Sequence, residues 1–238
     1  MEYVDMHCHC HEISIDELRE YTKKIILVCV SDDPGSSEAT IELTKYVDIV
    51  PCIGIHPWEA HNYSLEDVDS LARFIDRHGI KCLGEIGLDK KFYPHTFEHQ
   101  LKIFIRFLEI AREYDLFMNL HTAGAWREVY ELLLKYDIKK AYFHWYTGPK
   151  TLLDSIVGSG YYIGINPAWK IQEKHRKIIE YAPITNIITE SDAPYKYRNL
   201  YMKPDLVFET IGYIAKVKNM DYDEAKQVIL NNYRRLFR

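Results

Sequence analysis

The sequence contains no long apolar run. Its longest notable one, Ile25 to Val30, is far too short to cross a bilayer. Met1 leads straight into a charged, strand-like segment, without the basic and then apolar leader that directs export. We therefore expect a protein that is not secreted and has no membrane span.

Paired cysteine spacings are also absent. The five cysteines are an odd number, and their spacing matches neither a zinc knuckle nor a disulfide framework. This pattern favours a reducing compartment. The expected location is the cytoplasm.

An excess of basic residues is missing as well. The formal net charge is −5, which argues against a broad basic footprint of the kind that neutralises nucleic-acid phosphates over a whole surface. A small local basic patch stays possible. The chain has no Gly/Ser/Pro-rich or acidic tract, and 47% hydrophobic with 27% charged residues is the composition of an ordered globular protein.

Short β-rich runs alternate with longer segments of helical periodicity, which is typical of parallel strands joined by crossover helices. The pattern predicts eight strands: Tyr3 to His7, Lys24 to Val30, Ile49 to Ile55, Lys81 to Ile86, Leu116 to His121, Ala141 to His144, Tyr161 to Ile165 and Asn186 to Thr189.

Amphipathic periodicity predicts the helices between and after these strands. They are Asp16 to Tyr21, Ser37 to Tyr46, Leu65 to His78, Phe97 to Tyr114, Ala125 to Tyr136, Lys150 to Ser159, Glu173 to Tyr181, Asp205 to Val217 and Asp221 to Phe237, with Ser14, Ser36 and Ser64 as candidate N-caps.

This order predicts an α/β fold, a closed (β/α)8 or TIM barrel. A chain of 238 residues fits one such barrel with few insertions. No linker or fixed-period repeat divides it, so residues 1–238 are expected to form one domain. Periodicity alone leaves a doubly wound open sheet as the alternative.

Metal-binding residue types stand at the ends of the predicted strands, where a barrel of this kind carries its chemistry. Six of the eight strand ends offer an imidazole or a carboxylate: His7 with His9, His56, Glu85, His121, His144 and Asp192. A single buried histidine is usually explained by ordinary hydrogen bonds. Here the same explanation would have to hold for every one of these residues at once. The set points to a metal site.

His7 and His9 are two residues apart, so both side chains leave the same face of a strand and can approach one ion. Cys8 and Cys10 then point the other way and are expected to pack against a helix. His11 lies past the strand and is interpreted as a surface loop residue.

Glu85 lies between Gly84 and Gly87 at the end of an apolar strand. A buried carboxylate there needs a cation or a hydrogen-bond donor as partner. An inward salt bridge to a Lys or Arg is the competing explanation.

In order along the chain, these residues resemble the TatD family of metal-dependent hydrolases and DNases, which belongs to the amidohydrolase-like barrels. The similar stretches are Val4-Asp5-Met6-His7-Cys8-His9, Gly54-Ile55-His56-Pro57, Gly84-Glu85-Ile86-Gly87-Leu88-Asp89, Leu120-His121, His144-Trp145-Tyr146-Thr147-Gly148 and Thr189-Glu190-Ser191-Asp192-Ala193-Pro194-Tyr195. The stretches Gly84 to Asp89 and Glu190 to Pro194 are the specific ones.

The resemblance implies a ligand set and a mechanism. His7, His9, Glu85 and Asp192 would bind one metal, and Glu85 would bridge to a second metal held by His121 and His144. Asp192 would also act as general base on a metal-activated water, so the implied catalytic residues are Asp192 and Glu85. The cofactor is one or two divalent ions, with Zn²⁺, Mn²⁺ and Mg²⁺ as candidates.

The family's Gly-Ile-His-Pro turn faces the substrate, so the resemblance gives His56 a phosphate-binding or electrophilic role. Thr147 stands where the family usually has a serine, and the common arginine after the fifth strand is missing from His121 to Gly124. The expected substrate-binding residues are His56, Lys90, Trp145, Thr147 and Arg198.

The resemblance also implies DNase activity on DNA ends, single strands or abasic sites. The four tryptophans follow predicted strands, and aromatic side chains can stack unpaired bases. Lysines and arginines gather on the same loops: Lys90, Lys91, Lys170, Lys196, Arg198 and Lys203. The alternative is that the aromatics only wall a pocket and that these cations are ordinary surface charge.

Three functions stay open at this level. A metal-dependent phosphodiesterase that acts on DNA is the leading one, and a hydrolase of a small ester, lactone or amide on the same site is the alternative. The third is a scaffold that binds metal without turnover, for which a base beside an open metal position has no use.

Overall fold

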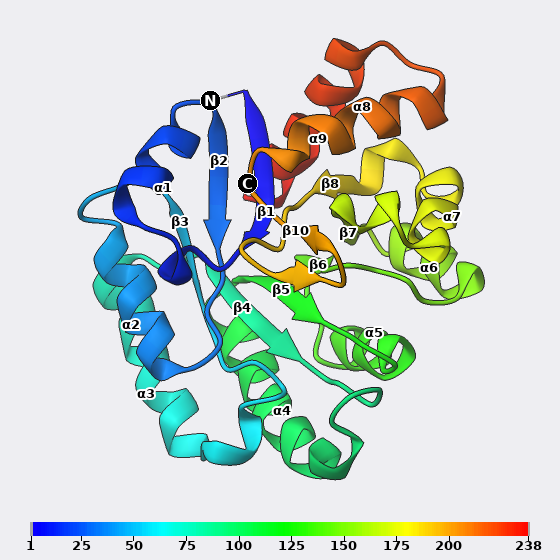
Figure 1. Ribbon diagram of the computed structural model, residues 1–238. Coiled ribbons are helices and arrows are strands. Elements are labelled where there is room, and N and C mark those ends of the chain that lie inside the picture. Colours follow the sequence, from blue (N-terminus) through cyan, green and yellow to red (C-terminus); the bar gives the residue numbers. More distant parts are fainter. Residues whose placement is uncertain (1, 238) are drawn as a thin grey trace.

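The computed structural model describes residues 2–237, and its centre is a sheet of eight parallel strands in sequential order, β1 to β8 (Figure 1). All eight predicted strands are confirmed. Their bounds are β1 Tyr3–Cys8, β2 Ile25–Cys29, β3 Val50–Ile53, β4 Cys82–Gly87, β5 Phe117–His121, β6 Ala141–Phe143, β7 Tyr162–Ile165 and β8 Ile187–Thr189. The terminal residues of the predicted domain, 1 and 238, lie outside the described residues.

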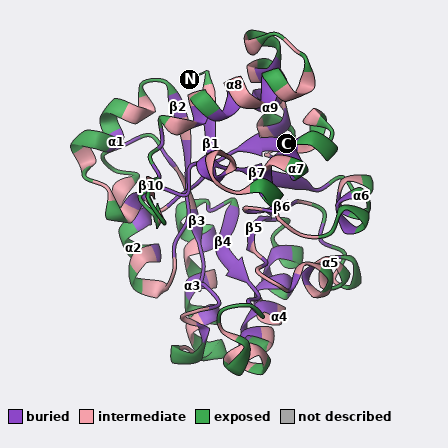
Figure 2. Ribbon diagram, turned by 45° about the vertical axis from the view of Figure 1, so that its right-hand side comes forward, coloured by how far each residue is buried: buried purple, intermediate pink, exposed green. Residues whose placement is uncertain are grey.

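Nearly continuous apolar sequence explains the strands, because parallel strands have both faces covered. In β4 every residue is buried, and in β2 four of the five are. Figure 2 shows these strands as the buried interior, with exposed residues on the surrounding helices. Two neighbouring parallel strands also need a long connection from the end of one to the start of the next, and the helical segments form these connections.

Contacts between the first and last strands close the barrel. Cys8 forms a parallel bridge with Ala193, and the Thr189 hydroxyl donates to the Val4 carbonyl at 2.7 Å. The Ser191 N–H donates to Asp5 Oδ1, also at 2.7 Å. Burial raises the pKa of Asp5 to about 8. These contacts decide between the two predicted architectures in favour of the barrel.

The nine predicted helices are present, each within a few residues of its expected bounds. They are α1 Ile15–Thr22, α2 Pro34–Leu43, α3 Leu65–His78, α4 Phe97–Glu113, α5 Trp126–Lys135, α6 Lys150–Gly158, α7 Glu173–Tyr181, α8 Leu206–Lys218 and α9 Tyr222–Leu236. None of the helices in residues 2–237 has the length and apolar character needed to cross a bilayer.

Helix caps follow the sequence with one correction. Ser14 caps α1, and Ser64 caps α3 through a capping box. The N-cap of α2 is Asp33 and not Ser36, because Pro34 takes the first helical position and places Ser36 at the third, where its hydroxyl completes the box.

The prediction of unpaired cysteines is wrong for four of the five. Disulfides join Cys10 to Cys29 and Cys52 to Cys82, and Cys8 is free and buried. Cys52 and Cys82 are register partners on β3 and β4, with Cα atoms 4.5 Å apart. Their spacing is that of two strands with a helix between them, so only the pairing of the strands reveals it. The cysteines therefore no longer argue for a reducing compartment.

The disulfides lead to a prediction about thiols and stability. Protein purified without reductant and then unfolded is expected to show one reactive thiol, Cys8, and five after reduction. The loops closed span 19 and 30 residues. Chain entropy then predicts that each disulfide adds about 3 kcal/mol to the free energy of unfolding.

Titration with a thiol reagent and denaturant unfolding with and without reductant measure both quantities. Cys8→Ala serves as a control, because its unfolding curve is expected to keep the same sensitivity to reductant. Five reactive thiols in the unreduced protein would refute both disulfides.

Candidate metal centre

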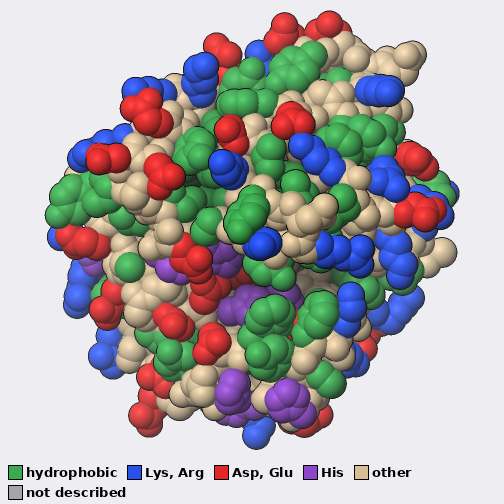
Figure 3. Space-filling model, viewed as in Figure 1, with side chains coloured by type: hydrophobic (Ala, Val, Ile, Leu, Met, Phe, Trp, Pro, Cys, Tyr) green, Lys and Arg blue, Asp and Glu red, His purple; other side chains and the backbone are tan. Residues whose placement is uncertain are grey.

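The predicted metal-binding residues meet at the carboxyl ends of the strands. Figure 3 shows imidazoles at the centre of this face, with acidic side chains on one side and the nearest Lys and Arg side chains on the other. His7, Glu85, His144 and Asp192 are buried, and His9 and His121 are partly exposed. The structure therefore brings all six residues together.

Glu85 lies at the centre of the cluster and reaches two groups of imidazoles. Its Oε2 is 3.2 Å from His7 Nε2 and 3.7 Å from His9 Nε2, and its Oε1 is 2.8 Å from His121 Nδ1. Burial alone would raise the pKa of Glu85, but the facing His56 and His7 and the His121 hydrogen bond hold that pKa well below its ordinary value. The partners are imidazoles and not the Lys or Arg of the competing explanation.

Asn119 determines the tautomer of His7. The Asn119 amide donates through Nδ2 to the Met6 carbonyl at 2.7 Å, so its Oδ1 must accept from His7 Nδ1 at 2.8 Å. The proton of a neutral His7 is therefore on Nδ1, and Nε2 carries a lone pair. That lone pair faces Glu85 Oε2, and Asp192 Oδ1 at 3.6 Å.

His9 and His144 are arranged in the same way. His9 Nδ1 lies 3.2 Å from Asp32 Oδ2, and His144 Nδ1 lies 2.9 Å from Glu190 Oε2. In its neutral form each ring then donates outward through Nδ1 and turns the lone pair of Nε2 inward, toward Asp192 Oδ1 at 3.6 Å and 3.7 Å. A carboxylate or amide oxygen behind an imidazole is the usual support of a metal-binding histidine.

His121 lies between two carboxylates. Its Nδ1 faces Glu85, and its Nε2 is 3.0 Å from Asp89 Oδ2, which also accepts from the Trp58 indole at 2.6 Å. Burial opposes protonation, but the hydrogen bonds to Asp89 and Glu85 outweigh it and raise the pKa of His121 to about 9. Asp89 thus holds both a ring of the cluster and an aromatic wall of the pocket.

His56 differs from the other four histidines. Its outer nitrogen, Nδ1, meets the Trp58 backbone N–H at 3.2 Å, which is a donor and not an acceptor. A neutral His56 therefore carries its proton on Nε2, 3.1 Å from His121 Nδ1 and 3.5 Å from Glu85 Oε1. His56, Glu85 and His121 lie close enough to hold an ion, but this tautomer makes His56 a hydrogen-bond donor.

A divalent cation fits the donors present. His7 Nε2 is buried and makes no hydrogen bond, although two carboxylate oxygens face it. Burial opposes protonation of His144, but the charges of Glu190 and Asp192 raise its pKa to about 9. The His7 lone pair faces carboxylates, and the pKa of His144 is raised. Both observations indicate a site that favours positive charge between these groups.

The structure separates the two histidines expected at a second metal. His121 lies with Glu85 and His56, whereas His144 lies with His7 and Glu190, and no such cluster in residues 2–237 holds both. The His144 ring also stacks on the His7 ring, with centroids 3.7 Å apart. His144 is therefore nearer to the first group of ligands than the sequence implied.

Backbone strain occurs at two residues of the site. Asp192 has φ 59° and Trp145 has φ 43°, in the left-handed region that non-glycine residues rarely adopt. The Asp192 N–H donates to the His7 carbonyl at 2.8 Å, and the Trp145 N–H donates to Glu190 Oε1 at 2.9 Å. These bonds hold both conformations, as is common at functional sites.

Sequence reasoning missed the residues behind the imidazoles: Asp32, Asp89, Asn119 and Glu190. Asp89 and Glu190 belong to family-like stretches but had no assigned role, and Asn119 carried no signal of its own. Two glycines leave space for the side chains behind the imidazoles. A Cβ on Gly84 would lie 2.7 Å from Asn119 Cβ, and one on Gly164 would overlap the Glu190 carboxylate.

The cluster opens into a cavity of about 690 Å³. Of the predicted substrate-binding residues, His56, Trp145 and Thr147 line it. Lys90 is not in its wall and pairs with Glu128, while the neighbouring Lys91 is in the wall. Arg198 is at the turn of a hairpin, β9 Lys196–Tyr197 with β10 Leu200–Tyr201, which the sequence did not predict.

Charge is divided across this cavity. Its acidic wall consists of Glu12, Asp32, Asp33 and Glu59, from the segments after β1, β2 and β3. Lys91 follows β4, and Lys196 and Arg198 follow β8. Lys170 is paired with Glu209 at 2.7 Å, so the basic rim is smaller than the sequence suggested.

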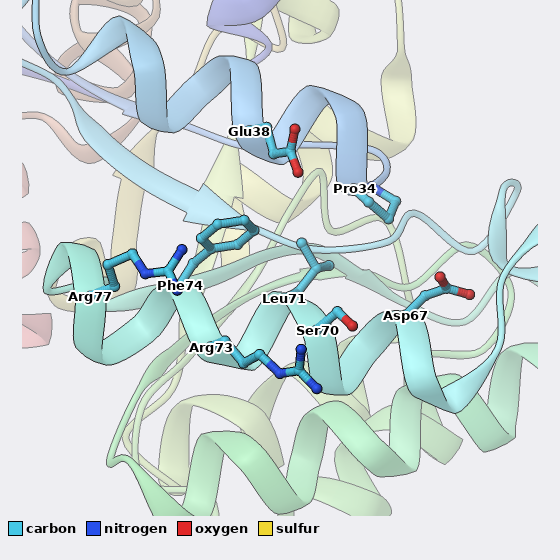
Figure 4. A pocket seen from close by; sticks show the side chains of 8 residues that line it. All are labelled: Pro34, Glu38, Asp67, Ser70, Leu71, Arg73, Phe74 and Arg77. Carbon is cyan, nitrogen blue, oxygen red and sulfur yellow. The ribbon is translucent and has the colours of Figure 1, made fainter.

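A second cavity of about 250 Å³ lies between α2 and α3 (Figure 4). Its charges are mixed, since Arg73 and Arg77 share the lining with Glu38 and Asp67. None of the candidate ion-binding clusters in residues 2–237 is there. We do not assign it a function.

Comparisons with known proteins identify the family and support the fold. The family model for TatD related DNase matches residues 4–238. An uncharacterized metal-dependent hydrolase of Methanocaldococcus jannaschii is 31% identical over 100% of this chain and 98% of its own length. Human deoxyribonuclease TATDN3 is 27% identical over 97% of this chain and 93% of its own. The crystal structure of the TatD homologue YjjV from Escherichia coli matches with a TM-score of 0.90 at 22% identity, over 99% of this chain and 98% of that one, and shows the same fold.

The close approach at Gly164 gives a prediction. Gly164→Ala is expected to displace Glu190, release His144 Nδ1 and lower the free energy of unfolding by about 1–3 kcal/mol. Cation affinity of the metal-free protein is expected to fall by about 10–100-fold. Denaturant unfolding and calorimetric titration with Mn²⁺ measure the two effects.

Gly158→Ala is the matched control, because a Cβ there meets nothing within 4 Å. It is expected to leave cation affinity unchanged. Equal affinities for Gly164→Ala and Gly158→Ala would show that Glu190 does not hold His144 for metal binding.

Proposed function

Because the chain belongs to the TatD family of metal-dependent hydrolases and DNases, within the amidohydrolase-like superfamily, we propose that it is a divalent-metal-dependent deoxyribonuclease. The chain is a metal-dependent hydrolase by family, and the proposal names its substrate as the phosphodiester bonds of DNA. The observation that carries it is the buried cluster of inward-facing imidazole nitrogens and carboxylates at the base of a cavity with aromatic walls.

His7, His9, Glu85 and Asp192 would hold a first cation, and Glu85, His121 and His144 would hold a second. Glu85 belongs to both sets because its two oxygens face different imidazoles. His144 would reach the second cation from the side of the first group, because its Nε2 lies 3.7 Å from Asp192 Oδ1. The mixture of imidazoles and carboxylates suits Zn²⁺ or Mn²⁺ and admits Mg²⁺.

When bound, divalent cations polarise phosphoryl oxygens and lower the pKa of water. Asp192 would be the general base. Its Oδ1 faces His7, His9 and His144, so the proton would be accepted at Oδ2. Asp192 also lines the cavity, so its carboxylate would be able to reach a water beside the substrate.

His56 would bind the substrate and not a metal. Its Nε2–H is fixed by the Trp58 amide and lies beside the cluster, where a phosphate oxygen would be held. A donor that is already oriented stabilises negative charge developing on such an oxygen. Trp145 and Thr147, from the loop after β6, would complete the substrate contacts.

The cavity walls support unpaired DNA as the substrate. Trp58, Phe92, Trp126, Trp145, Tyr195 and Tyr197 line them. Phe92 and Tyr195 are 56% and 46% exposed, so their rings are open to a ligand. Aromatic faces bind unpaired bases by stacking and do not depend on base identity. This favours single strands, strand ends or abasic sites over intact duplex.

A small ester, lactone or amide is the alternative substrate. One observation favours it: the acidic wall of Glu12, Asp32, Asp33 and Glu59 repels phosphates on that side of the cavity. The cavity volume is also within the range of small-molecule sites. A nuclease is expected to prefer oligonucleotides to small chromogenic esters, and the alternative predicts the reverse order.

Cleavage of labelled DNA tests the proposal. Single-stranded and abasic duplex DNA, labelled at the 5′ or 3′ end, are incubated with Mn²⁺, Mg²⁺, Zn²⁺ or EDTA. Cleavage is expected with a cation and not with EDTA. Asp192→Asn is expected to keep bound metal and lose about 10²–10⁴-fold in kcat, and Glu85→Ala to lose both metal and turnover.

Two results would contradict this account. Cleavage by Asp192→Asn at the wild-type rate would remove the general base. Intact metal binding without DNA cleavage would favour the small-substrate alternative.

Unpaired cations provide a second test. Lys91, Lys196 and Arg198 each lie over an aromatic ring and have no carboxylate within ion-pair distance in residues 2–237. Replacing all three with Ser is expected to weaken oligonucleotide binding. The slope of log Kd against log salt concentration is expected to fall by about 2, since each phosphate contact on a single strand contributes ~0.7.

The double variant Lys90→Ser with Lys170→Ser is the control, because both side chains are already paired with glutamates. Its slope is expected to stay near that of the wild type. Equal slopes for the triple variant and the wild type would exclude these residues as phosphate contacts.

A further inference from the structure

Two polar residues beside the metal centre are not among those proposed to bind metal or substrate. Asp32 follows β2, and His11 lies in a short 3-10 helix, Cys10–Glu12. Asp32 Oδ2 is 3.2 Å from His9 Nδ1 and 3.3 Å from His11 Nε2. His11 is only 13% exposed, so its interpretation as a surface loop residue is wrong.

The backbone of Asp32 is held from two directions. Its N–H donates to Ser36 Oγ at 2.8 Å, within the capping structure of α2. Its carbonyl accepts from the His56 N–H, also at 2.8 Å. The position of the carboxylate is therefore set by a helix start and by the loop after β3, and not by His9 itself.

A disulfide joins the segments that carry these residues. Cys10 lies between His9 and His11, and it is bonded to Cys29, three residues before Asp32. The same segments are linked along the strands, where the Val30 N–H donates to the Cys8 carbonyl at 3.0 Å. The contact between Asp32 and the two imidazoles thus joins backbone segments that are already tied together.

Two chemistries could use this group of side chains. His9, His11 and Asp32 lie close enough to hold an ion, which would be an outer cation site. However, the two nitrogens of His9 face different groups. If His9 Nε2 binds the inner cation, His9 Nδ1 carries the proton and can only donate. The contact at 3.2 Å has the length of such a hydrogen bond.

We propose that Asp32 is a positioning residue that orients His9 for metal binding, and that His11 in turn orients Asp32. The proposal rests on the ligand role proposed for His9. Asp32 Oδ2 hydrogen-bonds to His9 Nδ1 and lies 3.3 Å from His11 Nε2, so losing His11 removes a contact that keeps the carboxylate turned toward His9. The His9 ring would then lose both its orientation and part of its basicity as a ligand.

The test is a titration of metal-free protein with Co²⁺, followed by calorimetry and by the visible absorption of the bound ion. Asp32→Ala is expected to weaken binding by about 10–100-fold and to change the absorption spectrum, because the geometry at the ion changes. His11→Ala is expected to give a smaller loss in the same direction. His11→Gln keeps an N–H donor near the position of Nε2 and is expected to recover most of the affinity.

Glu59→Gln is the matched control. Glu59 belongs to the same acidic wall, but its carboxylate bonds to Asn62 and not to an imidazole. It is expected to bind Co²⁺ like the wild type, which separates a loss of orientation from a loss of general negative charge. The thermal unfolding of each metal-free variant shows whether it is folded.

Two outcomes would overturn the proposal. One is wild-type affinity and spectrum in both Asp32→Ala and His11→Ala. The other is a wild-type protein that binds one more equivalent of Co²⁺ than His11→Ala, which would establish an outer cation site. No DNA is used, so a protein that binds Co²⁺ as expected and cleaves no DNA would refute the nuclease and not this proposal.

Discussion

The lone pair of His7 Nε2 faces the carboxylates of Glu85 and Asp192, with no hydrogen-bond donor to satisfy it. The arrangement is costly in a buried site unless a cation lies between the groups. The other residues at this end of the barrel are arranged around these three groups. Glu85 reaches a second imidazole group through its other oxygen, and Asp192 completes the first group from the segment after β8.

A layer of hydrogen-bond acceptors behind the imidazoles makes this possible. Asn119, Asp32 and Glu190 each accept a hydrogen bond from Nδ1 of one ring, so the neutral ring turns the lone pair of Nε2 inward. His56 has a donor behind it and acquires the opposite tautomer. An acceptor behind an imidazole therefore suits its inner nitrogen to a metal, whereas a donor behind His56 suits its inner N–H to an oxygen of a substrate.

The barrel also divides charge around its mouth. Carboxylates follow the first three strands, whereas the unpaired cations follow the fourth and the eighth. A substrate with phosphates is attracted to one side of the metal centre and repelled from the other. The net charge of the chain does not predict this division, because lysines in ion pairs, such as Lys90 and Lys170, count equally with unpaired ones.

The sequence by itself predicted the eight strands and the helices, because apolar periodicity is a local property, and it placed metal-binding residue types at the strand ends. The set of six ligands came from the resemblance to the TatD family. The sequence could not determine the disulfides, which depend on which strands are neighbours, or the hairpin after β8. The partners of Asp32, Asn119 and Glu190 were equally out of reach, since each contact joins different strands or the loops that follow them. Only the closed barrel decides which nitrogen of each ring is free, because the acceptor behind it comes from another part of the chain.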